Sequence, residues 1–282
     1  MFMNTGIETK KCTICSGGFE ITDEDKKFYE TLSPTFNGQK YPIPSPSLCP
    51  HCRQRRRLSH RNERTLYKRK CSLSGRDIVC IYSPNVTFPV YDHKAFFSEA
   101  WDPLNYGKDL DFTKSFFENY KLLADVAPHI MNYSMDNENS DYGNLSSWNK
   151  NCYLCFESDS NDSCFYCEYT FRSKNVHDCS YSTTNSECYS CCDIRNCYNL
   201  LFSLNCHNTK NSYFLDNCEN CEFCFMSSNL VGKKYLFENI ELSQEEYEKK
   251  ISQLDFSSHK KIQLLSEQFQ KMKTLSLQKY IH

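Results

Sequence analysis

A short motif recurs through residues 130–238 and restricts the fold of this 282-residue chain more than any other feature. It consists of a polar residue, then Cys or Ser, then often Tyr or Phe. Its central residues are Cys152, Cys164, Cys179, Cys188, Cys197, Cys206, Ser212 and Cys218. The steps between them are 12, 15, 9, 9, 9, 6 and 6 residues, all multiples of three. Such a regular period is typical of a stacked repeat.

The residue types in these repeats favour a β-solenoid. The segments are too short and too polar for helical repeats, whereas short strands joined by Asn, Asp and Ser corners fit stacked coils. Asn and Asp tolerate the left-handed backbone of a corner, and Cys behaves as a small hydrophobic residue in a narrow interior. By analogy with known β-helices, we expect coils of about 18–22 residues and about five turns.

Several repeat cysteines also form Cys-x-x-Cys pairs, which is a pattern of metal ligands. These pairs are Cys152/Cys155, Cys164/Cys167, Cys188/Cys191 and Cys221/Cys224. An iron–sulfur cluster needs four converging thiolates, whereas a ladder of coils places its thiols in rows. We therefore expect these thiols to stack inside the solenoid, with metal binding as the alternative.

Two other cysteine pairs precede the repeats and predict a metal site. Cys12 and Cys15 form the first pair, and Cys49 and Cys52 form the second, with 33 residues between the pairs. Four thiolates suffice for one tetrahedral Zn²⁺ site, and they leave no open position for catalysis. A module with so small a hydrophobic core needs a bound metal ion to stabilise its fold. We expect one structural zinc and no catalytic residue.

A basic stretch directly follows the second pair. Residues 51–70 contain nine Lys or Arg and one acid, a net charge of +8 in a chain whose net charge is −2. The nine are Arg53, Arg55, Arg56, Arg57, Arg61, Arg64, Lys68, Arg69 and Lys70. Residues 53–70 contain no Pro or Gly, so we expect one helix there. A basic helix indicates phosphate contact with RNA or DNA. Charge balance against the thiolates and the acidic remainder is the alternative.

Four further helices are expected from capping signals and periodicity. Thr22 and Asp25 resemble a capping box and begin a short helix. A helix over about 113–126 carries an apolar stripe that we expect in the core. The stripe comprises Phe116, Phe117, Tyr120, Leu123 and Ala124. Ser243 begins a capping box and with it a first C-terminal helix. A second C-terminal helix over about 258–277 is expected to cover the open end of the solenoid.

The first seventy residues resemble the probable zinc-ribbon family of treble-clef type. The matching residues are Cys12, Cys15, Phe19, Phe28, Tyr29, Cys49, Pro50, Cys52, Arg53 and Arg56. Nearly the whole chain is similar to longer bacterial-type proteins in which this module precedes Asn-Cys-Tyr repeats. The resemblance implies a treble clef, in which the basic helix leaves directly from the second cysteine pair. It implies no particular activity.

The same resemblance implies a second pair of Cys-x-x-Cys motifs after the basic stretch. Here Cys71 has Ser74 as its partner, and the later pair falls at Asp92 and Ala95. We therefore expect the second site to be lost. Two alternatives are an irregular metal site made by Cys71, Cys80, Asp92 and His93, and a metal-dependent nuclease with His93 as general base.

The absence of targeting signals bears on the compartment. No run of 18 apolar residues is present, so no membrane span or membrane partner is expected. The first residues lack a charged region followed by an apolar stretch, so no secretory signal is expected. Nineteen cysteines in such a chain favour a reducing, cytoplasmic location. A secreted disulfide scaffold is the alternative.

The expected protein is mainly β with helical termini. Residues 1–70 form a treble-clef zinc ribbon, 71–129 a hairpin and helix connector related to a second zinc ribbon, 130–238 the β-solenoid, and 239–282 the capping helices. The expected function is non-enzymatic zinc-dependent binding of nucleic acid, with RNA favoured. The alternative is a structural or assembly protein that binds a protein partner or itself through the solenoid. No small-molecule substrate is indicated.

Overall fold

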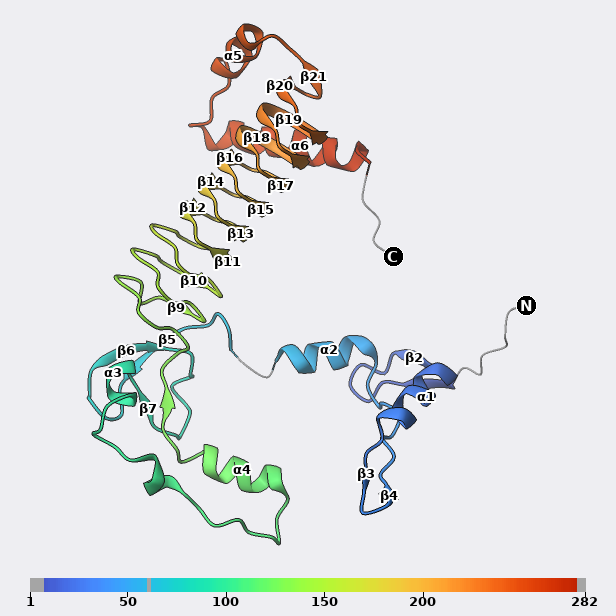
Figure 1. The fold of residues 1–282 in the computed structure, drawn as a ribbon, viewed down its shortest axis with the longest axis vertical. Helices are drawn as coiled ribbons and strands as arrows, with labels where there is room; N and C mark the ends of the chain where they lie inside the picture. The colour runs from blue at the N-terminus through green and yellow to red at the C-terminus, as the bar shows by residue number, and fades with distance from the viewer. Residues whose placement is uncertain (1–7, 60–61, 278–282) are drawn as a thin grey trace. The chain divides into compact units, whose positions relative to one another are not determined.

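The computed structural model describes residues 8–59 and 62–277. The chain forms two compact units, Met1–Asn62 and Glu63–His282. The structure is mainly β, with helices toward both termini and a β-solenoid of about eight turns, which confirms the predicted fold class (Figure 1). No helix in the described ranges is long and apolar enough to cross a membrane.

The first unit is a small module of hairpins and helices. Its elements are β1 (Glu8–Lys11), β2 (Gly18–Ile21), α1 (Asp23–Leu32), β3 (Thr35–Phe36), β4 (Gln39–Lys40) and α2 (Pro50–Leu58). The predicted capping box of α1 is confirmed, because the N–H of Asp25 donates to Oγ1 of Thr22 and the N–H of Thr22 donates to the carboxylate of Asp25. The helix α2 ends at Leu58, well before residue 70.

The second unit opens with another small hairpin module. Its elements are β5 (Tyr67–Lys70), β6 (Asp77–Cys80), β7 (Val90–Tyr91), α3 (His93–Phe96), the 3₁₀ helix η1 (Pro103–Tyr106), α4 (Phe116–Ala124) and β8 (His129–Ile130). Residues 67–70 form a strand because they pair with β6 in antiparallel register, from Tyr67 with Cys80 to Lys70 with Asp77. Strand pairing decides the structure here, because the helix propensities of these residues are only a weak preference.

The helix α4 corrects one expectation. The predicted helix is present and begins with a capping box of Ser115 and Glu118, but its apolar stripe is not in the core. Phe116, Phe117 and Tyr120 are 67%, 79% and 61% exposed. The helical periodicity predicted from the sequence is present, but no other element in the described part of the second unit covers this face.

The residues that follow β8, up to Glu241, form the solenoid. Its strands are β9 (Gly143–Asn144), β10 (Cys155–Phe156), β11 (Glu168–Phe171), β12 (Lys174–His177), β13 (Ser180–Thr183), β14 (Ser186–Tyr189), β15 (Cys192–Arg195), β16 (Tyr198–Leu201), β17 (Leu204–His207), β18 (Lys210–Glu219), β19 (Glu222–Val231), β20 (Lys234–Phe237) and β21 (Ile240–Glu241). The strands β9 to β20 stack in parallel, and each residue pairs with the residue twelve positions later, as Glu168 does with Ser180. Only β21 is antiparallel among these described strands.

A triplet of residues is the structural unit of each coil. Every third residue from Leu145 to Glu238 has a left-handed backbone. In the triplet 151–153, Asn151 has a φ of 52°, Cys152 is buried and Tyr153 faces outward. The recurring polar–Cys–aromatic motif is therefore corner residue, inner residue and outer residue. This assignment explains why all motif steps are multiples of three.

The coils are shorter than expected. Four triplets close a twelve-residue coil, so the expectation of about 18–22 residues and about five turns was wrong. The physical reason is that each triplet contains a left-handed residue, which bends the chain at every third position.

The inner side chains complete hydrogen bonds that the strands leave open. The N–H of Leu215 donates to Oγ of Ser203 one coil earlier (3.0 Å), and that hydroxyl donates to the carbonyl of Leu201 (2.9 Å). Cys179 does the same, since its Sγ accepts the N–H of Cys191 (3.3 Å) and donates to the carbonyl of His177 (3.2 Å). Inner positions therefore favour small side chains that both donate and accept.

Asparagine has a separate role at the corners. Asn208 has a φ of 51°, a left-handed conformation that Asn tolerates better than most residues. Its amide also links coils, because Asn196 donates to Oδ1 of Asn208 (3.2 Å) and Asn208 donates to Oδ1 of Asn220 (3.1 Å). The corner asparagines thus form a ladder along the outside of the solenoid.

The chain ends with α5 (Gln244–Ser252) and α6 (His259–Leu275), which pack on the last coils (Figure 1). Ser243 and Glu246 form the predicted capping box of α5. Phe269 of α6 is 4% exposed, and its ring lies 5.7 Å from that of Phe214. The aromatic side chains of the final coils are therefore covered by these helices, as expected of a solenoid cap.

Candidate metal centre

The four N-terminal cysteines predicted as metal ligands come together. The sulfur atoms of Cys12, Cys15, Cys49 and Cys52 all lie within 4.8 Å of one another. Sγ of Cys15 lies 3.7 Å from Sγ of Cys49. A tetrahedral site with zinc–sulfur bonds of about 2.3 Å has sulfur–sulfur edges of about 3.8 Å. The cluster therefore has the size of a four-thiolate metal site.

Local backbone geometry positions these ligands. Cys12 follows β1 and begins a tight turn, in which the N–H of Ser16 donates to the carbonyl of Cys12 (2.9 Å). Ser16 adopts a left-handed φ of 60°. Cys49 is the N-cap of α2 and Cys52 lies in its first turn. The turn and the helix start thus supply one pair of thiols each, which is the arrangement of a zinc-ribbon-like site.

The electrostatics of the cluster call for a cation. Backbone N–H groups of Cys15 and Cys49 lower the pKa of Cys12 to about 6. Burial, together with the neighbouring thiols, raises the pKa of Cys52 to about 12. Four adjacent thiolates repel one another, so all four can ionise together only if a metal ion compensates their charge.

The second hairpin module repeats the backbone hydrogen bonds of the first. In the first module, the N–H groups of Cys12, Ser16 and Thr13 donate to the carbonyl groups of Gly17, Cys12 and Ser47, respectively. In the second module, the N–H groups of Cys71, Gly75 and Ser72 donate in the same way to the carbonyl groups of Arg76, Cys71 and Val90. Gly75 has a left-handed φ of 72°, which Ser16 adopts in the first module. Cys71, Ser74, Asp92 and Ala95 therefore occupy the four ligand positions.

Hydrogen bonds, rather than four sulfur ligands, join these positions in the second module. Asp92 accepts from Ser74 Oγ (2.5 Å), from the N–H of Ala95 (2.9 Å) and from the Arg76 guanidinium (2.9 Å). The N–H groups of Ser74 and Asp92 point to Sγ of Cys71, each at 3.3 Å. Burial raises the pKa of Asp92, but these bonds outweigh it and lower that pKa to about 2. Sequence reasoning missed Arg76 here.

The alternative metal set of this module does not converge. Within the described residues, Cys71, Cys80, Asp92 and His93 form no group of metal-ligand atoms. The thiol of Cys80 donates to the carbonyl of Tyr82 (3.3 Å), and Nε2 of His93 lies 2.7 Å from Oδ1 of Asn132. His93 is therefore held by an amide in the structure.

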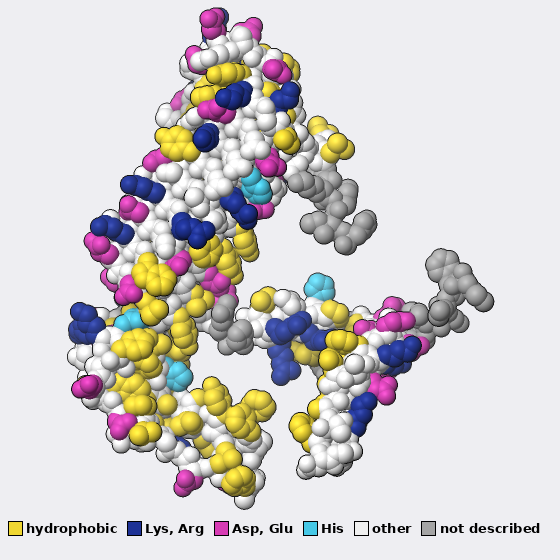
Figure 2. Space-filling view, in the orientation of Figure 1, with side chains coloured by type: hydrophobic (Ala, Val, Ile, Leu, Met, Phe, Trp, Pro, Cys, Tyr) yellow, Lys and Arg dark blue, Asp and Glu magenta, His cyan; other side chains and the backbone are white. Residues whose placement is uncertain are grey.

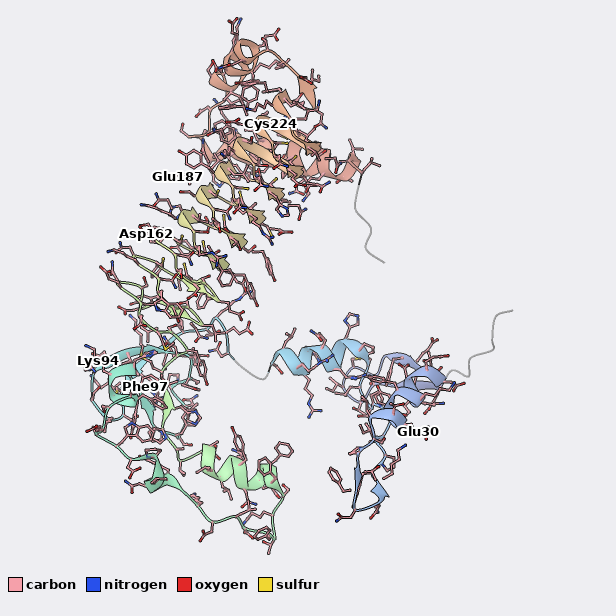
Figure 3. All side chains as sticks on the ribbon, viewed as in Figure 1. Glu30, Lys94, Phe97, Asp162, Glu187 and Cys224 are labelled. Atoms are coloured by element: carbon pink, nitrogen blue, oxygen red, sulfur yellow. The ribbon has the colours of Figure 1, made fainter. Side chains whose placement is uncertain are left out.

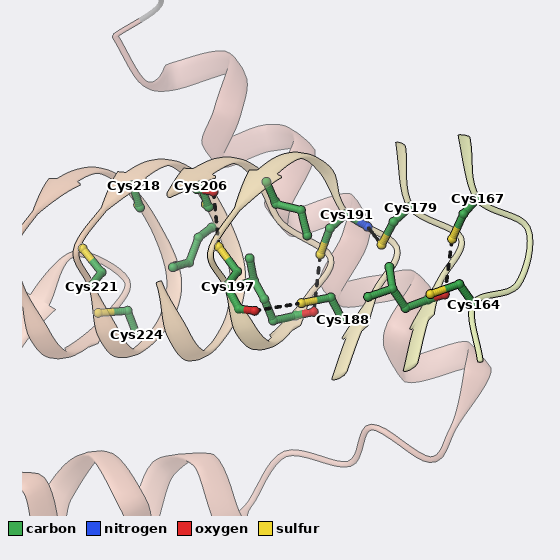
Figure 4. Packing of buried hydrophobic residues seen from close by; sticks show 14 of the residues in the cluster. Cys164, Cys167, Cys179, Cys188, Cys191, Cys197, Cys206, Cys218, Cys221 and Cys224 are labelled. Atoms are coloured by element: carbon green, nitrogen blue, oxygen red, sulfur yellow. Dashed lines mark hydrogen bonds between the residues drawn. The ribbon is translucent and has the colours of Figure 1, made fainter. Parts of the chain in front are cut away.

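The repeat cysteines are stacked in rows along the solenoid interior (Figure 4). They form no second metal-ligand group among residues 8–59 and 62–277. Burial raises the pKa of both Cys188 and Cys197 to about 12, so these thiols stay protonated. Each donates to carbonyl oxygens, for example Cys197 to Arg195 at 3.3 Å. At Cys188 and Cys197 these are properties of hydrogen-bonding inner residues and differ from those of metal thiolates. Elsewhere in the rows, hydrogen bonds with neighbouring thiols lower the pKa of Cys152, Cys167 and Cys221.

The predicted basic residues are divided between the two units. Arg53, Arg55, Arg56 and Arg57 lie on α2, and Arg61 lies outside the described residues. The others belong to the second unit. There Arg64 pairs with Glu168, Lys70 pairs with Asp77 (3.0 Å), and Lys68 and Arg69 lie on β5. The structure thus does not bring all nine onto one helix.

Comparisons with known proteins add no assignment. No model of a known protein family matches the chain, and no curated protein is similar to it. The resemblance to zinc ribbons therefore rests on the four clustered cysteines and their local geometry.

Proposed function

We propose that this protein is a non-enzymatic, cytoplasmic zinc protein that binds nucleic acid, RNA in preference, through the basic face of α2. The observation that carries this proposal is the start of α2 at a metal-ligand position. Cys49 caps the helix, Cys52 lies in its first turn, and exposed Arg55, Arg56 and Arg57 follow. The metal would thus fix the direction in which the basic side chains point.

The charge on α2 supports phosphate contact. The helix contains four arginines and no acidic residue. Arg53 donates to the hydroxyl of Tyr29 (3.4 Å), and Arg55 lies 4.0 Å from the sulfur of Cys52. Neither contact is with a carboxylate. Guanidinium groups on a helix suit bidentate contact with phosphate oxygens.

Salt-dependent binding to generic RNA and DNA tests this proposal. We expect affinity at low salt to fall as salt rises, because bound phosphates release counterions. Replacing Arg55, Arg56 and Arg57 with Ala is expected to weaken binding and to reduce the salt slope by about 0.7–0.9 for each lost phosphate contact. A stronger effect on RNA than on DNA supports the preference.

A matched control removes the same charge elsewhere. Lys249, Lys260 and Lys271 are exposed on α5 and α6, and their replacement with Ala is expected to leave affinity within about twofold. No binding at low salt, or equal loss in both triple variants, would contradict a role for α2.

A second candidate function is protein assembly, which the exposed α4 favours. Hydrophobic side chains gather over the α4 segment of the second unit in Figure 2, where Phe112 is 89% and Phe117 is 79% exposed. A contiguous group of exposed apolar side chains typically marks an interaction surface. Concentration-dependent self-association without nucleic acid, reduced by Phe117→Ser, is the expected result in analytical ultracentrifugation.

A further inference from the structure

A cleft of about 720 Å³ lies in the second unit, where the β5–β6 hairpin and α3 meet the first solenoid coils. Among the residues that line it are Lys68, Arg69, Ile78, Lys94 and Tyr142. A second hollow of about 440 Å³ shares Lys94 with the first, so the two adjoin. Volumes of this order are typical of small-molecule sites.

Three of the four Lys and Arg side chains that line this cleft are not paired with a carboxylate among the described residues. Lys68, Arg69 and Lys94 have no carboxylate partner in the described structure. Lys94 leaves the exposed side of α3, near Phe97 (Figure 3). Three uncompensated cations around one concave surface create a positive potential that attracts an anion.

The acidic residues of the cleft do not reverse this charge. Asp77 is paired with Lys70 at 3.0 Å, and Asp92 with Arg76 at 2.9 Å. Asp141 is the remaining carboxylate on the wall of the larger cleft. The cleft therefore keeps a net positive charge.

Two buried polar atoms are unsatisfied at this place. Nη1 of Arg69 and Oγ of Ser134 are buried and have no hydrogen-bond partner among residues 8–59 and 62–277. Arg69 lines the larger cleft, and Ser134, only 8% exposed, lines the adjoining hollow beside Asp136. Leaving a buried donor without a partner is unfavourable, and most such groups in proteins are satisfied. A ligand oxyanion would satisfy the Arg69 donor.

The remaining wall offers apolar surface and one more acceptor. Met131 and Ile78 line the cleft beside Tyr142, whose ring is 37% exposed. His93 also lines it, and its Nε2 lies 2.7 Å from Oδ1 of Asn132. Since the amide nitrogen of Asn132 donates to the carbonyl of Gly143, Nε2 of His93 is the donor. Nδ1 then remains an acceptor for a ligand hydroxyl.

We propose that this cleft binds a phosphate monoester that carries a flat apolar group, the chemistry of a nucleoside monophosphate. Arg69 and Lys94 would hold the phosphate, Lys68 on the other face of β5 would add to the positive potential, and Tyr142 would face the flat group. Either a free nucleotide or the 5′-phosphate end of an RNA presents this chemistry. The site uses no residue of α2, so it is independent of the proposed nucleic-acid surface.

Isothermal titration of the full-length protein tests the proposal, with AMP, adenosine and inorganic phosphate as probes. We expect saturable binding of AMP, at least tenfold tighter than that of adenosine or phosphate alone. Arg69→Gln is expected to weaken AMP binding at least tenfold. Lys94→Gln is expected to weaken it severalfold, and this exposed residue can be changed without affecting the fold. Short RNAs with and without a 5′-phosphate distinguish an RNA end from a free nucleotide as the source of the ligand.

Arg195→Gln is the matched control, because Arg195 is exposed on β15 and does not line the cleft. It is expected to leave AMP binding unchanged. Absence of saturable AMP binding, equal binding of adenosine, or equal effects of Arg195→Gln and Lys94→Gln would overturn the proposal. Loss of AMP binding on changing Arg55, Arg56 and Arg57 would instead assign it to α2 and would also overturn the cleft site.

Discussion

At the scale of single residues, the function of an inner side chain is to complete backbone hydrogen bonds. Cysteine was expected in the solenoid interior as a small hydrophobic residue, but Cys179 accepts an N–H group and donates to a carbonyl just as Ser203 does. This dual role explains why Cys, Ser, Thr and Asn alternate at inner positions. This pattern is visible in the sequence, because Cys, Ser, Thr and Asn all recur at the same position of the three-residue period.

We predict that Ser203→Ala destabilises the solenoid by about 1–3 kcal/mol, because the buried N–H of Leu215 loses its acceptor. Cys179→Ser is the matched control and is expected to be nearly neutral, since serine keeps both hydrogen bonds. Urea denaturation measures both changes. Equal stability of the two variants would contradict the hydrogen-bonding role.

Asp92 gives a prediction about pH. Its pKa is about 2 in the folded protein and 3.8 ordinarily, so its carboxylate stabilises the fold above pH 4, and this contribution is lost as pH falls through about 2. The shift corresponds to about 2 kcal/mol. Asp92→Asn is expected to lower stability by that order at pH 7 and to have little effect near pH 2. A pH-independent difference between variant and wild type in urea denaturation would argue against this account.

At the scale of elements, the two hairpin modules have one backbone pattern and two different means of holding it. The first brings four thiols within 4.8 Å of one another. The second joins the same positions through Asp92, Ser74 and Arg76. The sequence predicted the cysteine set of the first module and the loss of cysteines in the second. It did not predict the replacement network, because Arg76 is separated from Asp92 along the chain.

This difference predicts a selective response to metal removal. The protein is expected to bind about one Zn²⁺ per chain, and a chelator or Cys52→Ser is expected to remove it. Hydrogen exchange should then become fast in β1, β2 and α2, because metal binding supplies much of the folding free energy of such modules. Amides of β5 and β6 are expected to remain protected.

Elemental analysis measures the metal content per chain. The same measurement also tests whether the repeat cysteines bind metal. A content of three or more metal ions per chain would mean that the inner thiols also bind metal. Loss of protection in β5 and β6 after chelation would show that the second module depends on the metal of the first.

At the scale of the whole molecule, the solenoid of the second unit requires a covered end. The helix α6 supplies part of this cover, with Phe269 packed near Phe214 in a buried aromatic cluster. Parallel strands left open at an end can pair with other chains. The C-terminal helices therefore protect the stack as well as extend its core.

We predict that Phe269→Ala costs about 3–5 kcal/mol, the usual range for removing a buried phenyl ring, and promotes aggregation. Leu275→Ala is the control on the same helix, because Leu275 is 89% exposed, and it is expected to change stability by less than about 0.5 kcal/mol. Thermal unfolding and light scattering measure these effects. A similar loss for both variants would mean that the helix acts through something other than this packing.

The local pattern along the chain determined the repeat, its three-residue period, the two N-terminal Cys-x-x-Cys pairs and the capped helices, because each depends on neighbours within a few residues. Tertiary structure alone decided the twelve-residue coil, the strand at 67–70, the exposure of α4 and the Arg76–Asp92 pair. Each of these depends on which distant segment pairs with or covers a residue, and hydrophobic period and propensity do not contain that information.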